Sequence, residues 1–212
     1  METTNLIDGA IVKTLQIGVI PYAMGLDSNL VRKIPDALPG VFDGVGPVTG
    51  GWHLTSLSSG IECVLQPSLR QISISSIGNE MEAFSQAVNI FQGIRTVMPT
   101  PHYLALTLGQ TFHLPAGGER TSTALINKRL LSEDRDPLRN EAYAVGLRYY
   151  FAAPNQSTIT VDPLLADPDL FFLQYSCVRP GAFAADDLGD QLQQLRTGNV
   201  GQLSAVVKYL LG

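Results

Sequence analysis

Four side chains on two segments of alternating polarity are the best suited to bind a ligand. Apolar residues alternate with Tyr103 and His113 in one segment, and with Arg148 and Tyr150 in another. Such alternation is typical of a half-buried strand. If the two strands are neighbours, aromatic rings, an imidazole and a guanidinium share one face, and that mixture suits an anionic or planar ligand or a partner protein. The alternative is an ordinary half-exposed sheet face with cross-strand pairs.

No motif in the chain occurs in the context that catalysis would require. Gly44, Gly46, Gly50 and Gly51 precede a strand that begins at Trp52, whereas a phosphate-binding loop opens a helix. The sequence has no G-x-S-x-G elbow and no H-E-x-x-H pattern. A Ser-His-Asp set stays open, because such sites are assembled in space. We therefore predict no catalytic residue, and we favour a protein that is not an enzyme.

The histidines His53, His102 and His113 do not have the spacing of a metal site. Zinc ligands typically recur within a few residues of one another, or one turn apart on a helix. His53 could approach Cys63 across a hairpin, but two ligands are too few. The sequence therefore predicts neither a metal nor another cofactor.

Composition limits the classes of partner. Charged residues make up 16% of the 212 residues, against about 25% in an average domain, so the surface is either covered by another subunit or rich in uncharged polar groups. The net charge of −5 argues against a nucleic-acid partner, and no stretch is long and apolar enough for a membrane span.

Cys63 and Cys177 lie far apart in apolar runs, as buried reduced thiols do. We expect a cytoplasmic protein that binds a protein partner or forms a homo-oligomer.

Hydrophobic periodicity predicts the elements of the first half. Strands are expected over 11–20, 52–57, 61–65, 72–74 and 103–114, with the second and third joined as a hairpin. Phe84, Phe91 and Ile94 recur at helical spacing and predict a helix over 79–98. A short helix from Leu30 should end before Pro35, and the glycines and prolines of 39–51 predict a loop.

The second half shows a similar pattern. Strands are predicted over 142–151, 157–161 and 170–178, and the last is apolar on both faces, which favours a central or interface position. Two helices should follow, with Gly198-Asn199 ending the first and beginning the second. The segment 119–139 is rich in charge and is predicted to be a solvated connection between the halves, with a short helix around Ser122 to Leu131.

The order of elements suggests two similar halves within a single domain of residues 1–212. The strands and the helix of 10–115 recur in 140–212, and the segments that begin at Val64 and Thr160 align around a shared proline. Each half can offer one sheet face to its own helix, so the two halves can share a core. We predict an α+β fold with antiparallel or mixed sheets and helices packed on one face.

Apolar motifs spread over most of the chain also match a known family. They are Trp52 to Ser56, Ser59-Gly60, Leu69, Phe84 and Leu203 to Leu210, whereas the Gly-Leu-Arg-Tyr stretch expected in an earlier strand occurs instead at Gly146 to Tyr149. On these residues the chain resembles a sporadically distributed prokaryotic family of uncharacterised proteins of about this length. The resemblance implies an α+β architecture and brings no activity.

Low charge, apolar strands and no catalytic set predict a non-enzymatic binding or assembly protein. Two alternatives stay open. One is an enzyme whose site is assembled on a sheet face from residues such as His113, Arg148 and Tyr150. The other is a structural subunit of a phage or defence system, which the low charge would also fit.

Overall fold

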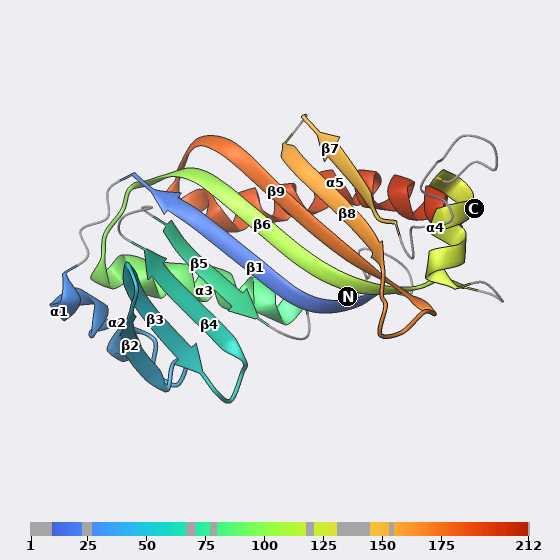
Figure 1. The fold of residues 1–212 in the computed structure, drawn as a ribbon. Coiled ribbons are helices and arrows are strands. Elements are labelled where there is room, and N and C mark those ends of the chain that lie inside the picture. The colour runs from blue at the N-terminus through green and yellow to red at the C-terminus, as the bar shows by residue number, and fades with distance from the viewer. Residues whose placement is uncertain are drawn as a thin grey trace.

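An antiparallel sheet forms the centre of the molecule. The computed structural model describes residues 10–22, 27–66, 71–76, 80–117, 121–130, 145–152 and 155–211. Within these residues the strands are β1 (Ile11–Pro21), β2 (Gly44–Val48), β3 (Gly51–Ser56), β4 (Ile61–Gln66), β5 (Gln71–Ser76), β6 (His102–Pro115), β7 (Leu147–Phe151), β8 (Gln156–Pro163) and β9 (Leu170–Ala184). They form one 9-stranded sheet in the order β2-β3-β4-β5-β1-β6-β9-β8-β7 (Figure 1). The predicted α+β class and the antiparallel pairing are confirmed.

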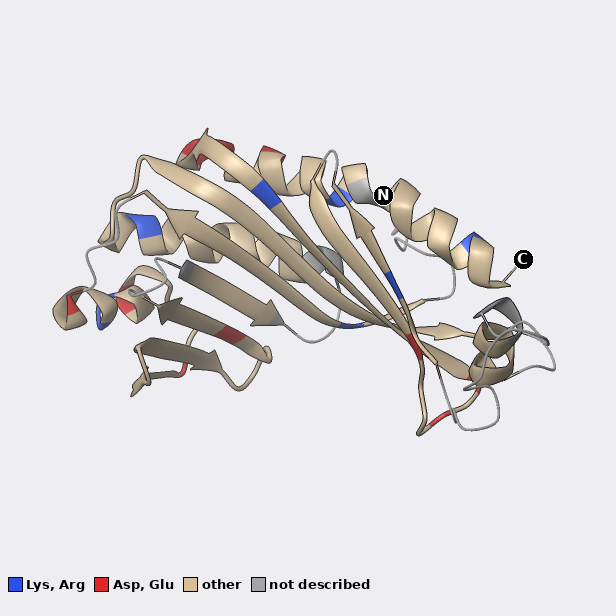
Figure 2. Ribbon diagram, turned by 45° about the horizontal axis from the view of Figure 1, so that its top comes forward, with Lys and Arg blue, Asp and Glu red and all other residues tan. Residues whose placement is uncertain are grey.

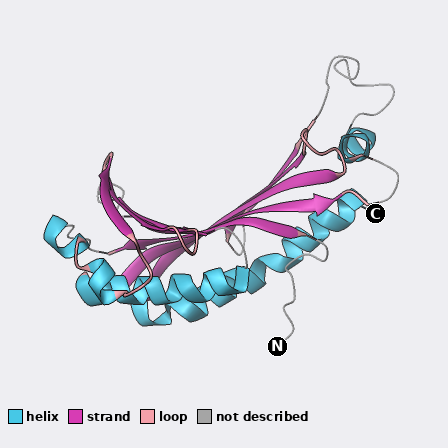
Figure 3. Ribbon diagram, turned by 90° about the horizontal axis from the view of Figure 1, so that it is seen from below, coloured by secondary structure: helices cyan, strands magenta, loops and turns pink. Residues whose placement is uncertain are grey.

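Helices cover one face of this sheet. They are α1 (Ser28–Val31), α2 (Ile34–Ala37), α3 (Glu80–Val97), α4 (Ser122–Leu130) and α5 (Leu188–Leu211), with a short 3-10 turn, η2 (Ala185–Asp187), before α5. The long helices α3 and α5 run along the same side of the sheet, as Figure 3 shows. None of the helices in the described part of the chain is long and apolar enough to cross a membrane.

The two halves of the sheet meet at β1 and β6, and the order of elements repeats about that junction. β5 lies beside β1 and leads into α3, while β9 lies beside β6 and leads into η2 and α5. β4 and β3 continue outward on one side, and β8 and β7 continue outward on the other. The aligned segments begin at Val64 in β4 and at Thr160 in β8, and these two strands occupy equivalent places in this order.

The core lies between the sheet and the helix layer. Alternate residues of each strand point toward α3 and α5, because successive side chains of a strand face opposite ways. The largest fully buried side chains are Tyr103, Tyr175, Phe91, Phe112, Phe171, Ile17, Ile34, Leu54, Leu65, Ile90, Ile94 and Leu106. Phe84, Phe91 and Ile94 are buried on α3, as the helical spacing predicts. Burying one such side chain stabilises the fold by about 1.5–3 kcal/mol.

One prediction near residue 40 is wrong and another is confirmed. Residues 44–48 form β2 rather than part of a loop, and Pro47 is tolerated there because β2 pairs on one side only, with β3. The short helix ends before Pro35 as predicted, since α1 ends at Val31. A second helix, α2, begins at Ile34, and Pro35 falls in its first turn, where a backbone N–H has no helical partner in any case.

The C-terminal stretch is a single helix of 24 residues rather than two. Gly198 and Gly201 both lie inside α5, with open space where a Cβ would be. The buried leucines on either side of them, such as Leu195 and Leu203, are eight positions apart and therefore share one helix face. Burial of that face against the sheet outweighs the low helix propensity of the glycines.

The charged segment 119–139 is packed in part, contrary to the prediction of a solvated connection. α4 forms where the short helix is predicted, and Ser122 and Ile126 on that helix are each 0% exposed. The backbone N–H of Ser122 donates to the carbonyl of Pro168 at 2.8 Å, which ties the start of α4 to the loop before β9. The rest of the prediction, from residue 131 onward, lies outside the described residues.

Candidate binding surface

The face of the sheet opposite α3 and α5 carries no described helix. Both ends of the sheet turn away from the helix layer, so this face is concave in Figure 3. We call it the open face. Its side chains, assigned from the strand register, include His53, Thr55, Glu62, Val64, Ser73, Ser75, Thr14, Gln16, Thr107, Thr111, His113, Phe172, Gln174, Ser176, Val178, Thr158, Thr160, Asp162, Arg148, Tyr150, Ile11, Ile20 and Gln156.

Short uncharged polar side chains dominate the open face. Of the side chains named, Glu62, Asp162 and Arg148 carry a full charge at neutral pH, and they lie on the outer strands β4, β8 and β7. Figure 2 shows how few positions on the strands are charged. A surface of this composition has no electrostatic attraction for phosphate groups. It offers hydroxyl and amide groups for hydrogen bonds and little bulk, so a partner can approach the sheet closely.

Hydrogen bonds between strands hold several of these side chains in place. The hydroxyls of Thr14 and Thr111 lie 2.7 Å apart across β1 and β6. Arg148 Nε donates to Thr160 Oγ1 at 3.3 Å across β7 and β8. Because such cross-strand pairs limit the side-chain rotamers, less conformational entropy remains to be lost when a partner binds.

Tyr103 does not lie on the open face, and this part of the prediction is wrong. The pairing of β6 with β1 and with β9 shifts register near Tyr103. A bulge interrupts the alternation of side chains, so Tyr103 is 1% exposed and its ring packs against Phe183 with centroids 5.6 Å apart. Burial raises the pKa of Tyr103 to about 12, against a smaller opposing effect of Arg95. Tyr103 is a core residue.

The other three predicted residues lie on the open face but do not form one site. β6 and β7 are not neighbours, because β9 and β8 lie between them. His113 and Arg148 are therefore about three strand spacings, or about 14 Å, apart across the sheet. Arg148 and Tyr150 are two positions apart on β7 and point to the same side. The structure thus brings Arg148 and Tyr150 together and leaves His113 apart.

His113 lies in an aromatic and partly apolar environment. Its ring meets Phe172 on the neighbouring strand at 70°, with centroids 6.3 Å apart. Partial burial lowers the pKa of His113, and the charge of Lys13 lowers it further, whereas Asp167 has the opposite effect. The imidazole is therefore neutral at neutral pH, and it contributes a flat polar surface rather than a charge.

The described residues do not converge on a catalytic or metal-binding arrangement. Among them, no three His, Cys, Asp or Glu side chains are grouped so that they could hold a metal ion. His53 and Cys63 lie on adjacent strands but on opposite faces, since His53 pairs with Val64 and Cys63 with Leu54. Burial raises the pKa of Cys63 to about 12, so its thiol is protonated and unreactive at neutral pH.

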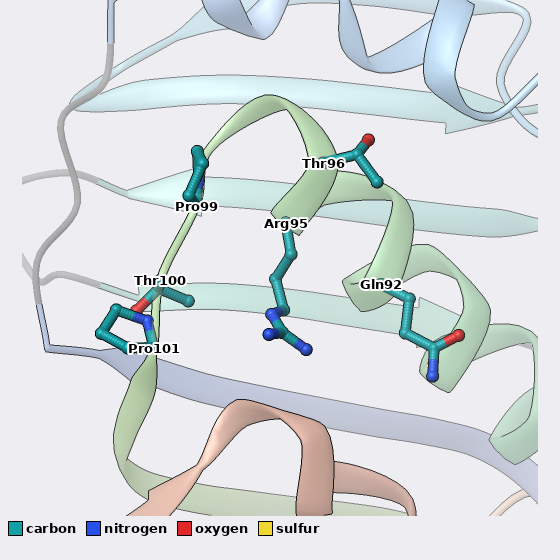
Figure 4. Close-up of a pocket in the computed structure, with 6 residues that line it drawn as sticks. All are labelled: Gln92, Arg95, Thr96, Pro99, Thr100 and Pro101. Atoms are coloured by element: carbon teal, nitrogen blue, oxygen red, sulfur yellow. The ribbon is translucent and has the colours of Figure 1, made fainter.

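A shallow cavity of about 460 Å³ lies outside the open face, where α3 ends and β6 begins. Its lining residues, Gln92, Arg95, Thr96, Pro99, Thr100 and Pro101, are shown in Figure 4. Arg95 supplies the charge in this cavity, and its Nη1 donates to Asp186 Oδ1 on η2 at 2.8 Å. Because that carboxylate already neutralises the guanidinium, the cavity does not favour an anionic ligand.

Comparisons with known proteins find no family and a weak structural similarity. No family model matches the chain, and no curated protein matches it. Among solved structures, the chain is similar to Methanococcus jannaschii TBP with a TM-score of 0.43 and 10% sequence identity, over 91% of this chain and 98% of that one. At this low similarity, the function of the chain has to be argued from its own residues.

Proposed function

We propose that this chain is a non-enzymatic binding or assembly protein that contacts a protein partner through its sheet. The observation that carries the proposal is the open face, where strands of both halves present short uncharged polar side chains and no described helix lies over them. Protein-binding surfaces are depleted in charge at their centres, and the centre of the open face is made by Gln16, Thr107, Thr111 and Ser176.

The absence of a convergent site among the described residues favours binding over catalysis. General acid–base chemistry needs two groups within reach of one substrate. His113 is about 14 Å from Arg148 across the sheet, so these two residues of the enzyme alternative do not form such a pair. No observation specifically favours the structural subunit of a phage or defence system.

Charge and the cysteines bear on the class of partner and on the compartment. Nucleic-acid binding requires a cluster of Lys and Arg, whereas Arg148 shares the open face with Glu62 and Asp162. Cys63 and Cys177 are both free, and β5, β1 and β6 separate the strands that carry them. They are too far apart to form a disulfide with each other. These features support a cytoplasmic protein with a protein partner rather than a nucleic acid.

Site-specific photo-cross-linking tests the proposal. A photoreactive amino acid replaces Gln174 or Ser176, which are exposed on the open face, and in a control chain it replaces Gln193, which is exposed on α5. The tagged chain is irradiated in cells and its adducts are separated by mass. We expect discrete, nuclease-resistant adducts from positions 174 and 176 and none from position 193. Excess unlabelled chain should suppress the adducts, and unlabelled chain with Ser176→Arg should not.

Three results would contradict the proposal. Equal adducts from all three positions would mean nonspecific contact. Adducts that disappear on nuclease treatment would mean a nucleic-acid partner. Irradiation without any adduct at positions 174 and 176, in cells and in concentrated purified protein, would mean that the open face contacts no macromolecule.

A further inference from the structure

The two edges of the sheet differ in their capacity to accept another strand. An exposed edge strand presents unpaired N–H and C=O groups, and proteins that avoid pairing interrupt such edges with proline, glycine or charge. β2 follows this rule, since it has the sequence Gly-Val-Gly-Pro-Val and Pro47 offers no N–H. β7 has the sequence Leu-Arg-Tyr-Tyr-Phe, which contains no proline or glycine and a single charged residue, Arg148, among residues that favour strands.

The outer side of β7 has no partner among the described residues. β7 pairs with β8 alone, from Leu147 opposite Val161 to Phe151 opposite Ser157. Tyr150 on this strand is 74% exposed, one of the most exposed large hydrophobic side chains of the chain. The phenol ring of Tyr150 is therefore accessible to a second chain that pairs with this edge.

The sequence of β7 is complementary to itself in antiparallel orientation. Two copies related by a two-fold axis at Tyr149 would pair over the full strand. Arg148 of each copy would then lie opposite Tyr150 of the other, and a guanidinium beside a phenol ring is an attractive cross-strand pair. On the helix side of the sheet, Leu147 would lie opposite Phe151 of the second copy. Both side chains are half-buried and pack against the core.

Other registers that keep each side chain on its own face are less favourable. Shifting the axis to position 148 places the two Arg148 side chains opposite each other, and like charges directly opposite are destabilising. Shifting it to position 150 pairs the two Tyr150 side chains but shortens the overlap within β7. The register centred on Tyr149 uses every residue of β7 and has no like-charge pair.

We infer that the partner of β7 is a second copy of this chain, and that two copies form a continuous antiparallel sheet by pairing β7 with β7 around Tyr149. The inference rests on the proposed function, because it makes the sheet the means of assembly. A two-fold axis perpendicular to the sheet keeps the helix layers of both copies on one side. The two open faces would then form one extended surface on the other side.

Substitutions that change the charges at positions 148 and 150 test the pairing. The dimer is measured by sedimentation of purified protein across about a hundredfold range of concentration. The unchanged chain should show a monomer–dimer equilibrium. Tyr150→Glu should preserve the dimer, since Arg148 would then face a carboxylate. Arg148→Glu with Tyr150→Glu should weaken the dimer at least about tenfold, because two carboxylates would face each other twice. Arg148→Glu with Tyr150→Lys should restore the dimer.

A matched control distinguishes dimerisation through the β7 edge from dimerisation through the open face. Gln174→Glu with Ser176→Glu introduces two carboxylates, as Arg148→Glu with Tyr150→Glu does, but on the inner strand β9, at exposed positions of the open face. This control should leave the dimer intact, and circular dichroism should show that every variant is folded. A dimer that the β9 variant breaks and the β7 variants spare would overturn the pairing at β7 while leaving the proposed function standing. A chain that stays monomeric but yields open-face cross-links to another protein would do the same, whereas a monomer without cross-links would overturn both.

Discussion

Gly93 on α3 leaves just enough room for the buried side chain of Leu38, which follows α2. A Cβ built on Gly93 would overlap the side-chain carbons of Leu38. Leu38 is 8% exposed, so it cannot swing into solvent without losing its burial. This close approach holds α2 against α3 and so fixes the segment that leads into the edge strand β2.

We therefore expect Gly93→Ala to lower the free energy of unfolding by about 1–3 kcal/mol, the usual cost of overpacking. The loss should occur although alanine is the better helix former by about 1 kcal/mol. In a chain that already carries Leu38→Ala the same substitution should cost little, because the overlap is gone. Urea unfolding of the four chains of this double-mutant cycle measures the coupling between the two positions.

The control for this cycle is Gly201→Ala on α5. Gly201 is exposed and has nothing within 4 Å of its built Cβ, so alanine there should raise the free energy of unfolding by about 0.5–1 kcal/mol. If Gly93→Ala were as harmless as Gly201→Ala, the close packing of α2 on α3 would be wrong.

Alkaline pH should destabilise the protein through buried groups that hold their protons. Burial raises the pKa of Cys63 from 9.0 to about 12 and that of Tyr103 from 10.0 to about 12. Burial also raises the pKa of Tyr175. The folded state therefore keeps protons that the unfolded chain releases, so stability is complete below about pH 9 and falls as the pH rises toward 12.

Urea unfolding at about pH 8 and about pH 10 measures this loss, which can reach about 1.4 kcal/mol per group for each pH unit above the pKa of the unfolded chain. Cys63→Ala removes one titrating group and should flatten the pH dependence, whatever it costs in packing. An unchanged slope in that variant would show that Cys63 is not the source.

Much of the fold follows from the sequence because the apolar patterns are long and regular. β1, β3, β4, β6 and α3 each have residues that alternate or recur at the period of the element that forms. β9 is apolar on both faces and lies inside the sheet, between β6 and β8, as that pattern predicts. Gly198 predicts a helix end that does not occur in α5, whereas its leucines remain in phase across the glycines and their period indicates one helix.

The elements that were missed depend on interactions that no local pattern contains. β2 is rich in glycine and has Pro47, and its pairing with β3 rather than its composition makes it a strand. Tyr103 lies in the core because a bulge interrupts an alternation that looks regular in the sequence. The sequence of a single strand does not determine which strands it pairs with. His113 and Arg148 could therefore be placed on one face of the sheet but not at their true separation.

The duplication of the two halves remains a prediction. The repeated order of strands and helices about β1 and β6 fits it. The extra edge strand β2 and the helix α4, which follows β6, would then be additions to a shared unit.

Hydrogen exchange of the purified chain at low and at high concentration tests most directly whether the sheet assembles through β7. An amide on the outer side of an edge strand exchanges freely until another strand accepts its hydrogen bond. The account predicts that amides of β7 become protected as the concentration rises, while those of β2 at the opposite edge do not change. Equal exchange of β7 at both concentrations, or new protection confined to β2, would contradict it.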